Sequence, residues 1–424
     1  MKKLVRFILI LTIFTLGMQI IKLPDIGLSP FQIMVIMATG FGVPLVMMQG
    51  MKSGLYLLVT FLWFFSSILA WQVSINPEWA KSYFLLGMMT TAIFLIVPNI
   101  FSRNDLPKLE RWMIRSQYIV IPFSIFTVIV FNAIGMMPDE IPLPGGMSIS
   151  LGAEDLDRGT AAGEVRLMLP YATPPVLSIV MAMSLTLLLF NDELFKKSIR
   201  WSLIGIFTTI LIMTGSRSGI MGLILLFFLL FVRGEFKRQL KKVKVEYIVV
   251  AIIALVVLFI VLMQFEYFQK MIIGRFYNPD REGIGEDRHY LVPLDGLLIW
   301  IGSASNFLFG IGFGSSIMMQ GAHTFLPPYF LNSFVTLLAE RGLMGLMLVA
   351  CLIWMFIRLF KLRRYMNKAE ISMTYSYFVA LAAAIFYEDF ISYYVIFTIA
   401  LSLMVHHCIE NDLKRNKYNY GRRK

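Results

Sequence analysis

Cysteine, histidine and charged residues are scarce in this sequence. Only Cys351 and Cys408 occur among 424 residues, so the chain lacks both the paired cysteines of a disulfide framework and the clustered thiolates of a metal site. Charged residues make up 15% of the chain and histidine occurs four times. Thiolate metal chemistry and a disulfide-stapled secreted domain are therefore excluded.

Hydrophobic residues are abundant instead. They make up 58% of the chain, the mean hydropathy is +0.73, and apolar runs of 18 or more residues recur. Such a run is long enough for a helix to cross the roughly 30 Å of hydrocarbon in a bilayer. A membrane β-barrel would show short alternating segments instead. We predict an all-α polytopic membrane protein, with residues 1–424 forming one integral membrane domain.

About twelve transmembrane helices are expected. They lie near 5–21, 31–48, 54–72, 82–101, 116–135, 172–190, 199–215, 218–232, 247–264, 342–357, 371–387 and 391–408. The first has the basic start of a signal peptide but no small-residue cleavage site before Lys22, so we interpret it as a retained span.

The net charge of +12 does not indicate a nucleic-acid partner in this setting. Most Lys and Arg residues fall in the segments that would face the cytoplasm if the N-terminus is inside, where they contact anionic lipid. This distribution predicts that both termini are cytoplasmic.

Two expected outer loops are long, 136–171 and 265–341. The first contains Asp155 and Asp157, whose spacing resembles the start of a calcium loop, but the later ligands are missing and we predict no metal site. The second, between the ninth and tenth spans, has apolar stretches that predict short helices. Its GIGFG segment follows no strand, so we interpret it as a sharp turn and not as a nucleotide site.

Three residues are candidates for chemistry. Arg217 lies in TGSRSG between the seventh and eighth spans, where its guanidinium, supported by Ser216 and Ser218, suits a phosphate or pyrophosphate. The alternative is an arginine that only reaches the lipid headgroups. Arg288 could join Arg217 on one doubly charged group, or form an exposed ion pair. His323 could accept a proton near neutral pH, or be a surface residue.

The chain resembles the O-antigen ligase and Wzy-type polysaccharide polymerase superfamily at these residues. The resemblance rests on TGSRSG before an apolar helix, on Asp287 and Arg288 followed by an apolar helix and FLFGIGFG, and on NSFVTLLAERGLMGL. It implies a GT-C-like fold and a bacterial inner-membrane glycosyltransferase that inverts the anomeric centre without metal or other cofactor. The implied donor is a polyprenyl-pyrophosphate-linked oligosaccharide on the outer leaflet.

The resemblance also implies roles for individual residues. Arg217 and Arg288 match the arginines that hold the pyrophosphate. The family has a His-Asn pair about ten residues before a Gly-Leu motif, and Asn332 stands at that distance from Gly342 but follows Leu331. Either an insertion shifts the base to His323, or another group accepts the proton.

We favour a polymerase that joins repeat units on the lipid carrier over a ligase that transfers the glycan to another acceptor. The expected partners are the lipid-linked donor, the growing glycan, membrane lipid, a chain-length regulator and a flippase. The alternative from another class is a transporter, a flippase for the same lipid-linked sugar. Few charges lie at the centres of the expected spans, which argues against transport.

Overall fold

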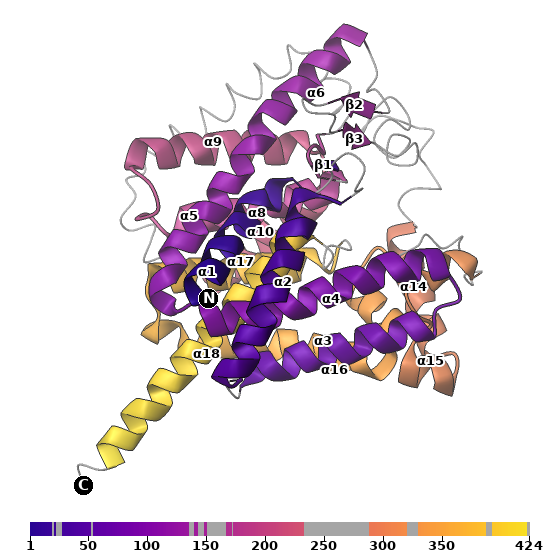
Figure 1. Ribbon diagram of the computed structural model, residues 1–424. Coiled ribbons are helices and arrows are strands. Elements are labelled where there is room, and N and C mark those ends of the chain that lie inside the picture. The colour runs from indigo at the N-terminus through magenta and orange to yellow at the C-terminus, as the bar shows by residue number, and fades with distance from the viewer. Residues whose placement is uncertain are drawn as a thin grey trace.

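The structure is a computed structural model, and it is nearly all helical (Figure 1). It describes residues 1–18, 21–22, 28–51, 54–134, 140–142, 148–150, 167–171, 173–232, 288–319, 330–386 and 392–421.

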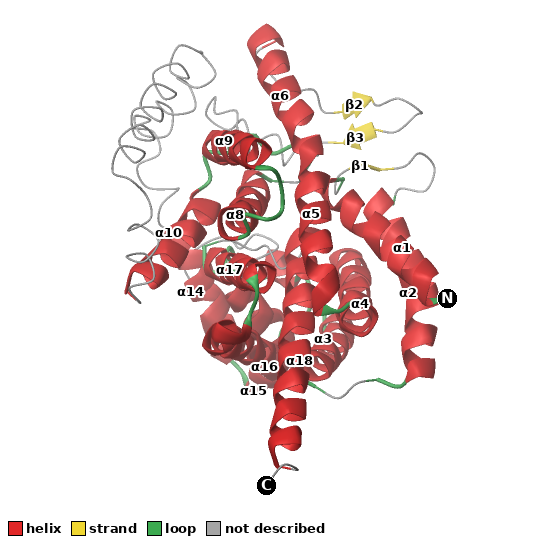
Figure 2. Cartoon of the chain, turned by 90° about the vertical axis from the view of Figure 1, so that its left-hand side faces the viewer, coloured by secondary structure: helices red, strands yellow, loops and turns green. Residues whose placement is uncertain are grey.

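The described helices are long and are joined mostly by short connections. They are α1 (Lys2–Phe14), α2 (Pro30–Gln49), α3 (Leu55–Gln72), α4 (Pro77–Ile100), α5 (Leu106–Ser116), α6 (Val120–Ile134), α8 (Pro174–Phe190), α9 (Lys197–Met213), α10 (Arg217–Val232), α14 (Arg288–Ile301), α15 (Ala304–Phe309), α16 (Ser333–Leu362), α17 (Lys368–Ala383) and α18 (Tyr393–Gly421). The strands β1 (Ile21–Lys22), β2 (Glu140–Pro142) and β3 (Ser148–Ser150) form a small antiparallel sheet in the order β1-β3-β2 (Figure 2).

The helices fit a membrane protein. Six helical stretches in the described chain are long and apolar enough to cross a bilayer, and α8 and α10 are shorter apolar helices. The six are Pro30–Gln49, Leu55–Gln72, Pro77–Ile100, Arg103–Ile129, Ser333–Tyr365 and Tyr393–Lys414. Each expected span coincides with a helix except 247–264, which lies outside the described residues. A helical membrane protein is therefore confirmed, and the number twelve stays a prediction.

The core is built around α8, α17 and the first half of α18, which are buried on all sides. Small residues let the neighbouring helices approach closely, as is common where helices associate within membranes. A Cβ atom added at Gly219 of α10 would lie 2.3 Å from the Ser178 carbonyl oxygen of α8. The backbones of α10 and α8 are thus so close at this point that only glycine fits.

Two charged segments expected in loops are helical. The first is α5, which runs beside α1: Arg6 donates to the Ile100 carbonyl and to Asp105, while Gly17 lies against the Ser116 carbonyl (Figure 2). Arg115, expected in an inner loop before residue 116, instead lies on this helix. The hydropathy pattern misses α5 because only one stripe of it is apolar, and that stripe is buried.

The second is the start of α16. This helix begins at Ser333 and not near 342, because the Asn332 side chain accepts hydrogen bonds from two amides of the first turn. Two helical pieces meet at Gly342, whose φ of 58° is accessible mainly to glycine. The last residues of the expected outer loop 265–341 are therefore helical.

Candidate functional site

Arg217 is the first residue of α10 and follows a tight turn. Gly215 has a φ of 58°, and the Ser216 amide donates to Thr214 Oγ1 at 3.2 Å. The buried hydroxyls of Ser216 and Ser218 lie 3.0 Å apart and hydrogen bond to each other. The two serines thus fix the turn, and the Arg217 side chain is exposed.

Contacts along α8 and α17 fix where this turn lies. Ser376 donates to the Met183 carbonyl at 3.4 Å, midway along both helices. Lys368, at the start of α17, pairs with Asp192, just after the end of α8, at 2.8 Å. The two helices therefore run in opposite directions, and the start of α8 lies beside the end of α17.

The first turns of α10 lie at the same place. The Gly219 amide donates to Ser178 Oγ, near the start of α8, at 2.9 Å. A Cβ at Gly222 would lie 3.6 Å from that of Ala383, the last residue of α17. We call this region, where α8 and α10 begin and α17 ends, the Arg217 end of the bundle. The opposite region is the Lys368 end.

Asn332 also lies at the Arg217 end. Its amide nitrogen donates to the Ile385 carbonyl at 2.8 Å, and the Ser333 amide donates to the Ala384 carbonyl at 2.9 Å. These bonds join the start of α16 to the residues that follow α17. The predicted supporting residue Asn332 is thus a helix cap and a link between helices.

Arg288 is the first residue of α14. One turn later, Val292 packs in a buried apolar cluster with Phe330 and Val335, which flank the start of α16. Val292 thus packs beside Asn332 and Ser333, the two residues that are hydrogen bonded to the segment after α17. The backbone of Arg288 is about one helical turn away from Val292. The side chain of Arg288 and all of His323 lie outside the described residues, so the convergence of Arg217, Arg288 and His323 stays a prediction.

A buried pair of charges escaped the sequence analysis. Arg341 was expected in a water-exposed loop, but it is buried within α16 and donates to Ser66 Oγ at 2.8 Å and Ser67 Oγ at 3.2 Å. Its guanidinium lies 4.6 Å from the Trp63 ring and 5.0 Å from the Phe313 ring. Cation-π contacts and hydroxyl acceptors together replace the water that this cation has lost.

The neighbouring Glu340 holds the glycine-rich segment. Its carboxylate accepts from the Gly314 amide at 2.8 Å, and its carbonyl accepts from the Gly312 amide at 3.1 Å. Gly310, Gly312 and Gly314 all have positive φ, so GIGFG is a sharp turn, as predicted. The sequence does show that Glu340 and Arg341 are unusual, since these two charges interrupt an otherwise apolar stretch. It does not show which residues they contact.

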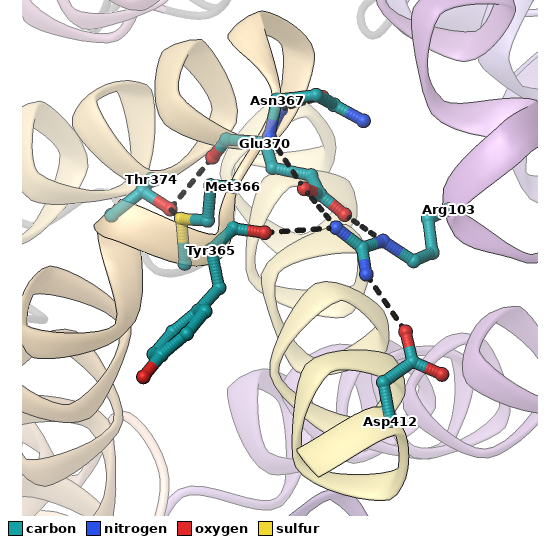
Figure 3. Close-up of polar contacts among 7 residues, drawn as sticks. All are labelled: Arg103, Tyr365, Met366, Asn367, Glu370, Thr374 and Asp412. Atoms are coloured by element: carbon teal, nitrogen blue, oxygen red, sulfur yellow. Dashed lines mark hydrogen bonds and ion pairs between the residues drawn. The ribbon is translucent and has the colours of Figure 1, made fainter. Parts of the chain in front are cut away.

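Ion pairs gather at the Lys368 end (Figure 3). Arg103 donates two hydrogen bonds to the Glu370 carboxylate and one to Asp412, at 2.7 Å, and a fourth to the Tyr365 carbonyl. Glu370 also accepts from the Asn367 amide in a capping box at the start of α17. This cluster ties α17 and α18 to the segment between α4 and α5, which indicates a structural role.

Among the described residues, no group of three or more histidine, cysteine, aspartate or glutamate side chains could hold a metal ion.

Comparison with known proteins adds no assignment. No known family profile matches the sequence, and no curated protein matches it.

Proposed function

We propose that this chain is a membrane glycosyltransferase that joins polyprenyl-pyrophosphate-linked oligosaccharide units into a surface polysaccharide. One observation carries the proposal: Arg217 and Arg288 are each the first residue of a helix, and both helices contact the segments that meet at the end of α17. A guanidinium group and the free backbone N–H groups at a helix N-terminus both bind anions, and together they bind a phosphate more tightly than either alone.

The reaction needs positive charge on the donor side. The acceptor hydroxyl attacks the anomeric carbon while the bond from that carbon to the pyrophosphate oxygen breaks, so negative charge grows on the leaving group. Fixed cations there stabilise the transition state more than the bound substrate. Arg217 and Arg288 supply two cations from the chain itself. The short outer loop expected between the first two spans contains only Asp25 as an acidic residue, so it offers few carboxylates for a metal ion. This also favours an arginine-based mechanism.

The acceptor must lose a proton during the attack. In the proposal His323 takes this proton, and direct displacement inverts the anomeric centre. The products are a longer lipid-linked glycan and free polyprenyl pyrophosphate. If His323 is not the base, Glu286 and Asp287 are the next residues to test.

Two other functions use the same substrate. A ligase would pass the glycan to a different acceptor through the same donor chemistry. A flippase is favoured by one observation, the buried Glu340 and Arg341 within a candidate membrane span, because transporters often carry such charges. Both residues have structural partners in the chain, Glu340 in the glycine-rich turn and Arg341 in α3, which is why we prefer the enzyme.

The test is turnover by the purified protein in liposomes that contain defined lipid-linked repeats. An enzyme makes longer glycans and releases polyprenyl pyrophosphate, and Arg217→Ala and Arg288→Ala abolish both products. Arg364→Ala, an exposed arginine beyond α16, is the matched control and leaves both unchanged. Movement of the substrate between leaflets without elongation would instead identify a flippase.

A further inference from the structure

A groove lies between the ends of α1 and α5. Its residues are distant in the sequence from Arg217, Arg288 and His323. It has a volume of about 360 Å³. Its lining comes from the last turn of α1 with the short helix Thr15–Gly17, and from the end of α5 with the short helix Gln117–Ile119. The lining residues are Phe14, Met18, Arg115, Ser116, Tyr118 and Ile119.

The walls of this groove are apolar and its rim carries one cation. Phe14 is 43% exposed although it is a large hydrophobic side chain, and it contacts Trp112 edge to face. Arg115 is exposed, and its guanidinium lies 5.1 Å from the Trp112 ring. Such a combination of apolar wall and stacked arginine matches an amphipathic ligand that has one negative charge.

Arg115 differs from the other arginines of the same segment. Arg103 is held by Glu370 and Asp412, and Arg111 donates to the Leu194 carbonyl at 2.9 Å. Within the described part of the chain, Arg115 forms no ion pair. The exposed guanidinium of Arg115 is therefore accessible to an anionic group from outside these residues.

The groove lies between the Lys368 end and the Arg217 end of the bundle. The Tyr171 hydroxyl, just before α8, donates to Gln117 at 2.6 Å, immediately after α5. Arg111, one helical turn before Arg115, donates to the Leu194 carbonyl beyond the end of α8, so Arg115 lies about one turn from the Lys368 end. Arg115 directly precedes the expected span 116–135, and an arginine beside an apolar helical stretch is well placed to meet a lipid headgroup.

We propose that this groove binds an anionic phospholipid. The Arg115 guanidinium hydrogen bonds the phosphodiester, the Tyr118 hydroxyl lies on the same rim, and an acyl chain packs against Phe14, Met18 and Ile119. A single guanidinium matches the single charge of a phosphodiester, whereas the pyrophosphate of the proposed donor calls for two cations. The lipid site is therefore separate from the donor site and independent of the proposed function.

The experiment is native mass spectrometry of the purified full chain, titrated with phosphatidylglycerol or with phosphatidylcholine. Phosphatidylglycerol binds more tightly, and Arg115→Gln weakens its binding about tenfold, the loss of roughly one charge-assisted hydrogen bond. Arg115→Lys, which keeps the charge, binds more tightly than Arg115→Gln. Phe14→Ala also weakens binding, because it removes part of the apolar wall.

Two matched variants control for general effects. Arg364→Gln removes another exposed arginine, which lies 4.8 Å from the Tyr365 ring, and Phe7→Ala removes another exposed phenylalanine of α1. Both leave phosphatidylglycerol binding unchanged. Unchanged binding in Arg115→Gln, equal binding of the two lipids, or an equal loss in Arg364→Gln would overturn the proposal. So would a dimer in the wild-type spectrum that Phe14→Ala abolishes, since a second copy would then cover the groove.

Discussion

Three of the described arginines illustrate different environments. Arg341 is buried between two aromatic rings and two serine hydroxyls, Arg103 is held by carboxylates, and Arg217 is exposed at the start of a helix. The first two environments hold the fold together. In the third environment the guanidinium is at the surface, as the proposed role in substrate binding requires.

Replacing Arg217 by lysine keeps the positive charge but removes the planar guanidinium group. We expect Arg217→Lys to retain binding of the lipid-linked donor but to lower the rate of transfer about 100-fold to 1,000-fold, because the planar fork that contacts two phosphate oxygens is lost. The measurement is kcat and KM for the release of polyprenyl pyrophosphate. A variant with the wild-type rate would remove the guanidinium from the mechanism.

Removing the Arg341 side chain should destabilise the protein. Arg341→Ala leaves Glu340 buried beside an empty space and removes both hydroxyl bonds, at a cost of about 3 to 5 kcal/mol. Thermal unfolding in detergent measures this loss. Arg364→Ala, whose arginine is exposed, is the control and should shift the melting temperature little. Equal melting temperatures for the two variants would show that the buried cation contributes nothing to stability.

At the scale of whole elements, glycines set the distance between helices near Arg217. Gly219 lies in the first turn of α10, against α8, where a Cβ atom would overlap the Ser178 carbonyl. Gly219→Ala should therefore push α10 away, lower the stability by about 1 to 3 kcal/mol and reduce transfer by moving Arg217. Gly205→Ala on α9, where no atom lies within 4 Å, should be neutral or slightly stabilising. Thermal unfolding and turnover assays of both variants would check this, and equal effects would contradict the close packing of α8 and α10.

The same elements show what could be predicted from the sequence. Continuous apolar runs predicted α2, α3, α4, α8 and α10 within a few residues, because hydrophobicity and length suffice for membrane helices. The pattern failed at α5, and it predicted a separate short helix in the outer loop where residues 333–341 are in fact the first turns of α16. The Arg341 guanidinium donates hydrogen bonds to Ser66 and Ser67, which are far away in the sequence, so a hydropathy pattern does not reveal them.

The candidate site was predictable only in part. TGSRSG correctly indicated a tight turn before a helix, because glycine and serine on both sides of Arg217 favour such a turn. Asn332 was matched by its spacing, but its actual role as a helix cap required the structure. The proximity of α10, α14 and α16 to the end of α17 depends on side-chain contacts between segments far apart in the chain, which no local pattern contains.

In the whole molecule, the two ends of the bundle are expected to lie at opposite faces of the membrane. The Lys368 end carries the ion pairs of Arg103, Glu370 and Asp412, and α18 continues beyond Asp412 with the basic residues Lys414, Arg415 and Lys417 (Figure 1). Because cytoplasmic segments collect Lys and Arg, we expect this end inside and the Arg217 end outside.

Cysteine labelling tests this orientation. In a variant with Cys351 and Cys408 replaced by serine, a cysteine at position 217 should react with a membrane-impermeant maleimide in intact cells. A cysteine at position 368 should react only after the membrane is opened. The reverse pattern would place the Arg217 end in the cytoplasm and exclude an outer-leaflet donor.

The central claim is that Arg217 and Arg288 bind one pyrophosphate. A cryo-electron microscopy structure of the protein with polyprenyl pyrophosphate tests it most directly. We expect both guanidinium groups within about 3 Å of oxygens of the same pyrophosphate, with His323 on the side from which the acceptor approaches. A pyrophosphate bound elsewhere, or arginines that face opposite sides of the membrane, would contradict it.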